Sequence, residues 1–525
     1  MTRRVLVTEA LDRTGIEILE AACEVTLRPG LAPHELIEAV GGYDALVVRS
    51  ATRVTAEVLA AGSRLVVVGR AGTGVDNIDV QAATRRGIVV VNAPTSNTVA
   101  VAEHTLALML ALARHVTAAD SSMHCGRWEK SGFVGTELRD KALGLVGLGR
   151  VGTAVAQRAQ GFEMRVLAYD PFVSPERAAQ LGVEMVNMDD LLRRSDYISL
   201  HAPATENTRG MIGARELAQM KPSTYLVNCA RGDLIEEEAL IEALNEGRIA
   251  GAALDVFADE PEVNPALCGI PNLILTPHLG ASTEEAQAGA SAQVARQVVD
   301  VLEGRPPRYS VNVPVTSPEE MGALEPYLEL ARCMGQFCAQ YVRDSIVWLE
   351  LICGGDLVEH DTTMVTAAAL VGLLSEAVDE PVNIVNARLV ARDRGLVVRE
   401  VRTPEAQGFS GLLTLRAGTT AQEHLIRGTV MRHQPHIVCL DGYWLDFVAG
   451  GVVLVSEHLE QPGVIGQMGT LLGEAGVSIS FVQVGREKRG GHGLMVVGLD
   501  DALSRETMEQ VLAMPSVQSA RVIRM

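Results

Sequence analysis

The sequence contains no long apolar run, no cluster of basic residues and no paired cysteines. Its longest apolar run, residues 106–113, is far shorter than the roughly 20 apolar residues that cross a bilayer. Only three apolar residues follow the arginines near the N-terminus, and the core of a signal peptide needs more. The eight cysteines stand singly, a pattern that favours neither a disulfide framework nor a metal site. We therefore expect a cytoplasmic protein with reduced cysteines and no bound metal.

Charge of one sign dominates the chain. There are 45 Lys and Arg against 65 Asp and Glu, a net charge of −20. Such a surface repels nucleic acid and anionic membranes, so neither is an expected partner. With 47% apolar and 21% charged residues, the composition is that of a globular protein, and 525 residues predict three or four domains.

The first three hundred residues alternate short apolar runs with amphipathic helical stretches. Continuous apolar runs are typical of strands buried on both faces, and their alternation with helices predicts parallel sheets. One series of runs precedes a long helical segment over 99–125 and a second series follows it. We therefore predict two doubly wound α/β domains with a cleft between them. The predicted strands are 5–7, 45–48, 65–68 and 89–91, then 143–146, 165–169, 197–200, 225–228, 251–255 and 273–276.

Glycine and proline mark two later boundaries. A Gly-Arg-Pro-Pro break at 304–307 leads us to end the α/β part near residue 315. A mixed helix-and-strand segment follows, and Gly450 and Gly451 mark its end. The remaining residues predict a βαββαβ order, which is that of a small ferredoxin-like module.

A glycine-rich loop follows the predicted strand 143–146 and opens a helix over 153–160. Gly147 permits a tight turn, Gly149 lets the backbone approach a pyrophosphate, and Gly152 lets the helix pack closely. Asp170 ends the next strand, eighteen residues after Gly152, where its carboxylate accepts hydrogen bonds from a ribose diol and repels a 2′-phosphate. The pattern predicts NAD rather than NADP; the alternative is a glycine turn that only packs a βαβ unit.

Three polar residues, Arg231, Glu260 and His278, follow later predicted strands. Ligands bind at the carboxyl ends of strands in open α/β sheets. Oxidation of an alcohol by hydride transfer needs a base for the proton, a cation for the substrate and a carboxylate for the base. Taken singly, the three residues have structural explanations: a hydrogen-bonded histidine, a surface ion pair and a loop acid. Together they favour catalysis.

Five stretches carry a resemblance to a known family: 70–77, 147–152, 228–232, 252–257 and 276–283. With them the chain resembles the D-isomer-specific 2-hydroxyacid dehydrogenases over essentially its whole length. The resemblance implies a split substrate-binding domain (1–97 and 285–315), a Rossmann NAD-binding domain (98–284), an α+β intervening domain (316–450) and an ACT-like domain (451–525). The implied reaction is NAD-dependent oxidation of D-3-phosphoglycerate to 3-phosphohydroxypyruvate, the first step of L-serine biosynthesis. The alternatives are a glyoxylate or hydroxypyruvate reductase, which usually lacks the C-terminal extension, and an NAD-sensing corepressor.

The resemblance also implies roles for individual residues. Arg231 matches the arginine that binds the substrate carboxylate, and His278 the general acid/base, with Glu260 as its partner. The substrate-side positions are Arg49 and Asn97, and charge makes Arg49 and Arg53 candidates for a phosphate ester, although Arg53 also suits a solvated loop. Lys130 lies on a loop, 128–130, that in the family reaches across to a partner subunit, which implies a homo-oligomer, dimer or tetramer. The implied cofactor-binding residues are Thr73, Gly147, Gly149, Arg150, Val151, Gly152, Asp170, Cys229, Asp255 and Gly280.

The C-terminal module is similar to ACT domains, which commonly bind an amino-acid effector, here serine. Serine-responsive members usually carry Arg-Pro-Gly at the first turn and Gly-Val-Asn-Ile after the helix. This chain has Gln461 and Ser478 at those variable positions, while His458 is retained. Because loss of the Asn amide removes a donor and an acceptor, we predict a weak response to serine or a module that serves only assembly.

Overall fold

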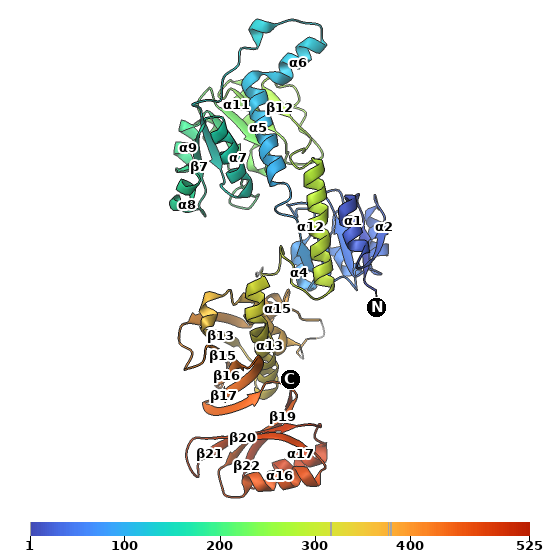
Figure 1. Cartoon of the computed structure of the whole chain (residues 1–525), viewed down its shortest axis with the longest axis vertical. Helices are drawn as coiled ribbons and strands as arrows, with labels where there is room; N and C mark the ends of the chain where they lie inside the picture. Colours follow the sequence, from blue (N-terminus) through green and yellow to red (C-terminus); the bar gives the residue numbers. More distant parts are fainter. Residues whose placement is uncertain (1, 315–317, 376, 379–380) are drawn as a thin grey trace.

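The computed structural model describes residues 2–314, 318–375, 377–378 and 381–525. It is elongated, with four sheets following one another along the long axis (Figure 1). The sheet nearest one end is formed by residues 142–275, the N-terminal sheet comes next, and the two C-terminal sheets follow. The predicted boundary between residues 315 and 316 lies outside the described residues.

The first sheet is wholly parallel, with strand order β2-β1-β3-β4-β5. The late helix α12 (Glu284–Leu302) returns to pack on it. Gly69 permits this contact, since a Cβ there would lie 2.7 Å from the side chain of Val294. The elements are β1 (Arg4–Val7), α1 (Arg13–Glu20), β2 (Glu24–Leu27), α2 (Pro33–Val40), β3 (Ala45–Val48), α3 (Ala56–Ala61), β4 (Val67–Arg70), α4 (Val80–Arg85) and β5 (Val89–Val91).

The second sheet is also parallel, with order β12-β11-β10-β9-β6-β7-β8, and helices cover both of its faces. Two parallel sheets of this kind confirm the predicted α/β class. The strands are β6 (Ala142–Val146), β7 (Arg165–Tyr169), β8 (Glu184–Met185), β9 (Tyr197–Leu200), β10 (Tyr225–Asn228), β11 (Gly251–Leu254) and β12 (Leu273–Leu275). The helices between them are α7 (Arg150–Gly161), α8 (Pro175–Gln180), α9 (Met188–Arg194), α10 (Ala214–Leu217), η2 (Gly232–Leu234) and α11 (Glu237–Asn245).

The helical segment predicted over 99–125 is two helices rather than one. Helix α5 (Thr98–Arg114) ends at His115, whose φ of 54° is left-handed, and α6 (Val116–His124) begins directly after it. Among the described residues no single helix is long and apolar enough to span a membrane; α5 and α6 meet that criterion only as a pair bent by 65°. A short turn, η1 (Lys130–Gly132), follows on the same projecting arm (Figure 1).

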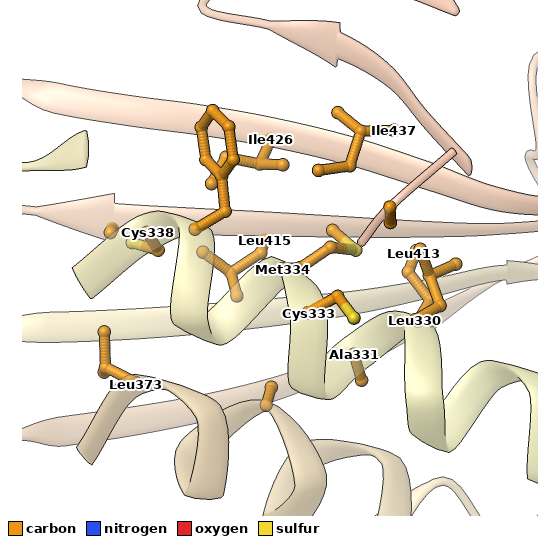
Figure 2. Packing of buried hydrophobic residues seen from close by; sticks show 14 of the residues in the cluster. Leu330, Ala331, Cys333, Met334, Cys338, Leu373, Leu413, Leu415, Ile426 and Ile437 are labelled. Atoms are coloured by element: carbon orange, nitrogen blue, oxygen red, sulfur yellow. The ribbon is translucent and has the colours of Figure 1, made fainter. Parts of the chain in front are cut away.

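The third sheet has order β14-β13-β15-β16-β17-β18 and is largely antiparallel. Helix α13 (Pro318–Tyr341) lies between this sheet and α14 (Thr363–Leu374), and its buried Leu330 and Met334 face the strands (Figure 2). Gly335 permits the close helix crossing, because a Cβ there would collide with the carbonyl oxygen of Ala369. The remaining elements are β13 (Trp348–Gly355), η3 (Asp356–Glu359), α15 (Ala387–Asp393), β14 (Val397–Thr403), β15 (Gly411–Gly418), β16 (Glu423–Met431), β17 (Gln434–Leu440) and β18 (Tyr443–Val448).

The fourth sheet is antiparallel, with order β20-β21-β19-β22, and its chain order β-α-β-β-α-β confirms the predicted pattern. Two helices cover one face. The other face packs on the third sheet in one continuous core, where the rings of Phe447 and Phe481 stack at 5.7 Å. The elements are β19 (Val452–Leu459), α16 (Val464–Glu474), β20 (Ile479–Arg486), β21 (His492–Leu499), α17 (Arg505–Leu512) and β22 (Val517–Arg524).

Candidate active site

A cleft of about 820 Å³ lies between the first two sheets, lined by loops that follow their strands. Both sides contribute charged groups. The first sheet supplies Arg49, Arg53 and Arg70, and the second supplies Arg231 together with Glu260 and His278. Asp76 and Asp79 also line the cleft, but its four arginines suit an anionic ligand.

The imidazole of His278 is bonded to the carboxylate of Glu260. Nδ1 of His278 lies 2.7 Å from Oε2 of Glu260, and Oε1 of Glu260 accepts the backbone N–H of Phe257 at 3.0 Å. The hydrogen bond to Glu260 raises the pKa of His278, although burial opposes this. Burial disfavours the Glu260 carboxylate, but the bonds from His278 and Phe257 outweigh it and lower its pKa. The ring's Nε2 is left as the nitrogen available to a ligand.

Asp255 anchors the segment that carries His278. This buried carboxylate accepts the backbone N–H groups of Leu279 at 2.7 Å and Gly280 at 2.8 Å, and the hydroxyl of Thr276 at 2.6 Å. Nε2 of His104 lies 3.2 Å from the same carboxylate. Burial acts to raise the pKa of Asp255, but these hydrogen bonds outweigh it and lower the pKa. The sequence analysis did not single out His104. The only sequence signal for it was its position, two residues before the apolar run 106–113.

Arg231 reaches across the cleft from the end of β10. Its Nε lies 3.3 Å from the carboxylate of Asp76, on the first-sheet side, and its Nη1 donates to the carbonyl of Ala230 at 2.7 Å. The side chain of Asp76 is 71% exposed. Asp76 was not singled out from the sequence, because a contact between two separate sheets leaves no local pattern.

The other predicted substrate-side residues divide into two groups. Arg49, Arg53 and Asn97 line the cleft, and the Asn97 amide oxygen accepts the hydroxyl of Thr73 at 2.8 Å. Lys130 lies on the projecting arm and is exposed, outside the lining of this cleft in the described part of its own chain.

The glycine loop has the geometry that a dinucleotide needs. Gly147 has a φ of 99°, and a Cβ there would lie 2.8 Å from the carbonyl oxygen of His201, while a Cβ at Gly152 would collide with the carbonyl oxygen of Gly147. At Gly149, no atom of the described residues other than its two chain neighbours lies within 4 Å of an added Cβ. This open backbone forms the N-terminus of α7, which borders a cavity of about 520 Å³ that Arg150 also lines. Backbone N–H groups at such a terminus suit a pyrophosphate.

The remaining predicted cofactor residues surround that loop. Asp170 accepts the backbone N–H of Leu148 at 2.8 Å and that of Phe172 at 2.9 Å, which holds its carboxylate beside the glycines. Val151 packs partly against the core. Cys229 is buried, and burial raises the pKa of its thiol to about 12, so the thiol stays protonated. The donor set and the open cradle fit NAD.

Comparison with known proteins also supports an NAD-binding site here. The model of the D-isomer specific 2-hydroxyacid dehydrogenase NAD binding domain matches residues 106–280, and that of the D-3-phosphoglycerate dehydrogenase intervening domain matches residues 323–441. The D-3-phosphoglycerate dehydrogenase of Synechocystis is 44% identical over 99% of this chain and 95% of its own length, and that of Methanocaldococcus jannaschii is 42% identical over 99% and 100%. A crystal structure of a glyoxylate reductase from Paecilomyes thermophila is 30% identical with a TM-score of 0.55, covering 61% of this chain and 99% of that one.

The fold and the site are those of an NAD-dependent dehydrogenase of the 2-hydroxyacid class. The match to full-length relatives extends through the two C-terminal sheets, which the reductase lacks. The chain belongs to the D-3-phosphoglycerate dehydrogenase family.

Proposed function

We propose that the protein oxidises D-3-phosphoglycerate to 3-phosphohydroxypyruvate with NAD, the first step of L-serine biosynthesis. The observation that carries this is the His278–Glu260 pair in a cleft that also holds Arg231, Arg49 and Arg53. A base and several fixed cations in one cleft suit an alcohol whose molecule bears both a carboxylate and a phosphate. Relatives named D-3-phosphoglycerate dehydrogenase match the chain over 99% of its length, which favours this substrate over the unphosphorylated acid of a reductase.

His278 is the general base of this reaction. Its Nδ1–H donates to Glu260, so the lone pair of Nε2 faces the substrate and takes the hydroxyl proton. The Glu260 carboxylate stabilises the imidazolium that forms. When NAD is bound, its nicotinamide accepts the hydride from the substrate carbon that carries the hydroxyl group.

Arg231 binds the substrate carboxylate and polarises the oxygen that becomes the carbonyl. In the free enzyme its charge is paired with Asp76, and an entering carboxylate takes over that pairing. Arg49 and Arg53 bind the phosphate, and Asn97 lies on the substrate side of the cleft. Closure of the cleft excludes water from the reacting atoms.

The glycine loop and its neighbours hold the cofactor. Asp170 binds the adenosine ribose diol, and its negative charge disfavours a 2′-phosphate. Gly147, Gly149 and Gly152 shape the pyrophosphate site. Asp255, through its bonds to Gly280, fixes the loop near the nicotinamide. Thr73, Arg150, Val151 and Cys229 provide further contacts.

A direct experiment is to incubate the protein with D-3-phosphoglycerate and NAD and follow NADH by absorbance. A mass spectrum should identify 3-phosphohydroxypyruvate in equal amount to the NADH formed. The His278→Ala variant should bind NAD but lose activity roughly 100-fold to 10,000-fold, the usual contribution of a general base. A wild-type protein that gives no NADH with this substrate would contradict the proposal.

We further propose that the protein is a homo-oligomer. The arm formed by α6 and the residues after it exposes large apolar side chains, with Trp128 80% and Val134 78% exposed. Such a surface is typical of an interface. In the proposed oligomer, Lys130 of the same arm contacts the substrate phosphate in the cleft of a partner subunit. Light scattering on the purified protein tests this, and a monomer at micromolar concentration would contradict it.

For the βαββαβ module we propose an ACT-type role with a weak response to serine. His458 Nδ1 and Ser516 Oγ are buried without a hydrogen-bond partner in the described part of the chain, which supports a polar ligand or water there. In the pattern of serine-responsive relatives an asparagine stands where this chain has Ser478, which lies at the opposite end of the sheet from His458. Serine should inhibit only at high concentration, and strong inhibition at low concentration would contradict this proposal.

The domain division and the location of the protein are proposals as well. We place the substrate domain at 1–97 and 285–315, the NAD domain at 98–284, the intervening domain at 316–450 and the ACT-like domain at 451–525. The return of α12 to the first sheet supports the split. The eight cysteines, all within the described ranges, are free thiols, which supports a reducing, cytoplasmic environment.

A further inference from the structure

One short loop, residues 49–53, carries both arginines proposed for the substrate phosphate. It follows the buried strand β3 and precedes α3. An arginine side chain loses much conformational entropy when it is fixed. Two arginines therefore bind an anion well only when their backbone is already held in place. The structure contains a set of contacts that provides this.

Glu9, two residues after the end of β1, binds the loop from one side. Its Oε1 accepts the backbone N–H groups of Arg49 at 2.8 Å and Thr52 at 2.9 Å, and its Oε2 accepts that of Ala51 at 3.1 Å. Burial disfavours the carboxylate, but these three backbone donors, together with the side chain of Thr52, outweigh it and lower the pKa of Glu9. The side chain is therefore ionised at neutral pH, and a charged acceptor makes each of these bonds stronger.

Asn77 binds the backbone carbonyl groups of the same loop. Its Nδ2 donates to the backbone oxygens of Arg49 at 2.8 Å and Thr52 at 2.6 Å. Its Oδ1 accepts Nε of Arg70 at 3.0 Å, which fixes the orientation of the amide. The backbone of Arg49 is thus held at its N–H by one side chain and at its carbonyl by another.

We propose that Glu9 and Asn77 are positioning residues that determine specificity for a phosphorylated substrate, by holding the loop 49–53 so that Arg49 and Arg53 converge on the phosphate. The inference rests on the proposed function. Neither residue contacts the reacting atoms; both act through the backbone of the loop. Their loss should therefore weaken recognition of the phosphate more than the proton transfer at His278.

The test measures kcat/KM for D-3-phosphoglycerate and for D-glycerate, which lacks the phosphate. Glu9→Gln keeps the size of the side chain but removes the charge and one acceptor oxygen. The ratio of the two kcat/KM values should fall about 10-fold or more, mainly through KM for the phosphorylated acid. The KM for NAD should stay at the wild-type value. Glu9→Asp, which retains the carboxylate, should recover part of the ratio, and Glu38→Gln on the exposed face of α2 is the matched control.

Asn77→Ser provides an independent variant, because it removes the other half of the contacts and should lower the same ratio. Thermal melting identifies any variant that does not fold. If the wild-type enzyme prefers D-glycerate, the proposed function itself fails. If the wild-type enzyme prefers the phosphorylated acid but both variants keep that preference, or lose both activities equally, the positioning role is overturned and the proposed function stands.

Discussion

At the scale of single residues, the chemistry depends on how the protein sets the charge of His278. The bond to Glu260 raises its pKa, and oxidation requires the unprotonated ring. The rate should therefore rise with pH as His278 loses its proton. The charge of Glu260 also stabilises the imidazolium that forms during reaction.

Replacement of Glu260 by Gln should change both the pH dependence and the maximal rate. The neutral amide no longer stabilises the imidazolium, so the pKa of His278 falls and the acidic limb of the pH profile moves to lower pH. The plateau rate should drop roughly 10-fold or more, because the base is weaker and less well oriented. A profile of kcat/KM from acidic to alkaline pH measures both changes. A limb that stays in place or moves to higher pH would contradict the assigned pairing.

Cofactor choice is a second property that one residue controls. Asp170 lies beside the glycine loop, bonded to the N–H of Leu148. The Asp170→Ser variant removes the charge that repels a 2′-phosphate, so kcat/KM for NADP should rise relative to that for NAD, by about 10-fold or more. Steady-state rates with each cofactor measure the ratio, and an unchanged ratio would mean that another group excludes NADP.

The sequence motifs identified residues that the structure brings together, but not all of their partners. His278 and Glu260 are eighteen residues apart in the chain, and their types and positions after strands were enough to single them out. Their catalytic roles stay predictions. His104 and Asp76 escaped notice because their contacts join a helix to a strand end, and one sheet to another. Such contacts depend on tertiary packing that no local pattern records.

At the scale of elements, the glycine loop can be tested by adding a single methyl group. In Gly152→Ala, the new Cβ meets the carbonyl oxygen of Gly147, so the loop must shift away from α7. We expect the Kd for NAD to rise about 10-fold or more, with a loss of about 1–3 kcal/mol in the free energy of unfolding.

Gly161→Ala, at the other end of the same helix, is the matched control. Apart from the adjoining backbone of α7, no atom of the described residues lies within 4 Å of a Cβ at this position, and alanine favours a helix by about 1 kcal/mol over glycine. This variant should keep NAD binding and gain slightly in stability. Calorimetric titration with NAD compares the two, and equal binding by both variants would contradict the role of Gly152.

Element boundaries show where sequence patterns stop being informative. The predicted strands of the second sheet agree closely with the structure, since its buried strands are continuous apolar runs. Strand β4 begins two residues later than predicted, and β2 was not predicted because its residues are only partly buried. The break between α5 and α6 rests on the left-handed backbone of His115, a conformation that only a few per cent of residues other than glycine adopt.

At the scale of the whole molecule, the two C-terminal sheets share one core, and the loop before α15 contacts the end of α4. Asn383 donates to the carbonyl of Gly87 at 2.9 Å, and Asn386 to that of Arg85 at 3.3 Å, at the end of α4. Helix α4 directly follows residues that line the cleft. These two amides are therefore a contact through which the C-terminal half is held against the substrate side.

The Asn383→Ala variant tests how firmly that contact holds the two halves. We expect a broader distribution of distances in small-angle X-ray scattering, because the bond to Gly87 is lost, while the third and fourth sheets still melt together. Gln434→Ala, an exposed residue of β17, should leave the scattering unchanged. A scattering profile of Asn383→Ala that matches the wild type would show that other contacts hold the halves together.

The central claim is that this cleft oxidises a phosphorylated D-2-hydroxy acid. The measurement that tests it most directly is the wild-type kcat/KM for D-3-phosphoglycerate beside those for D-glycerate and D-lactate, with NAD in excess. The account predicts a preference of about 100-fold or more for the phosphorylated acid. This ratio corresponds to about 3 kcal/mol of transition-state stabilisation by the contacts to the phosphate. Equal or faster turnover of an unphosphorylated acid would contradict it.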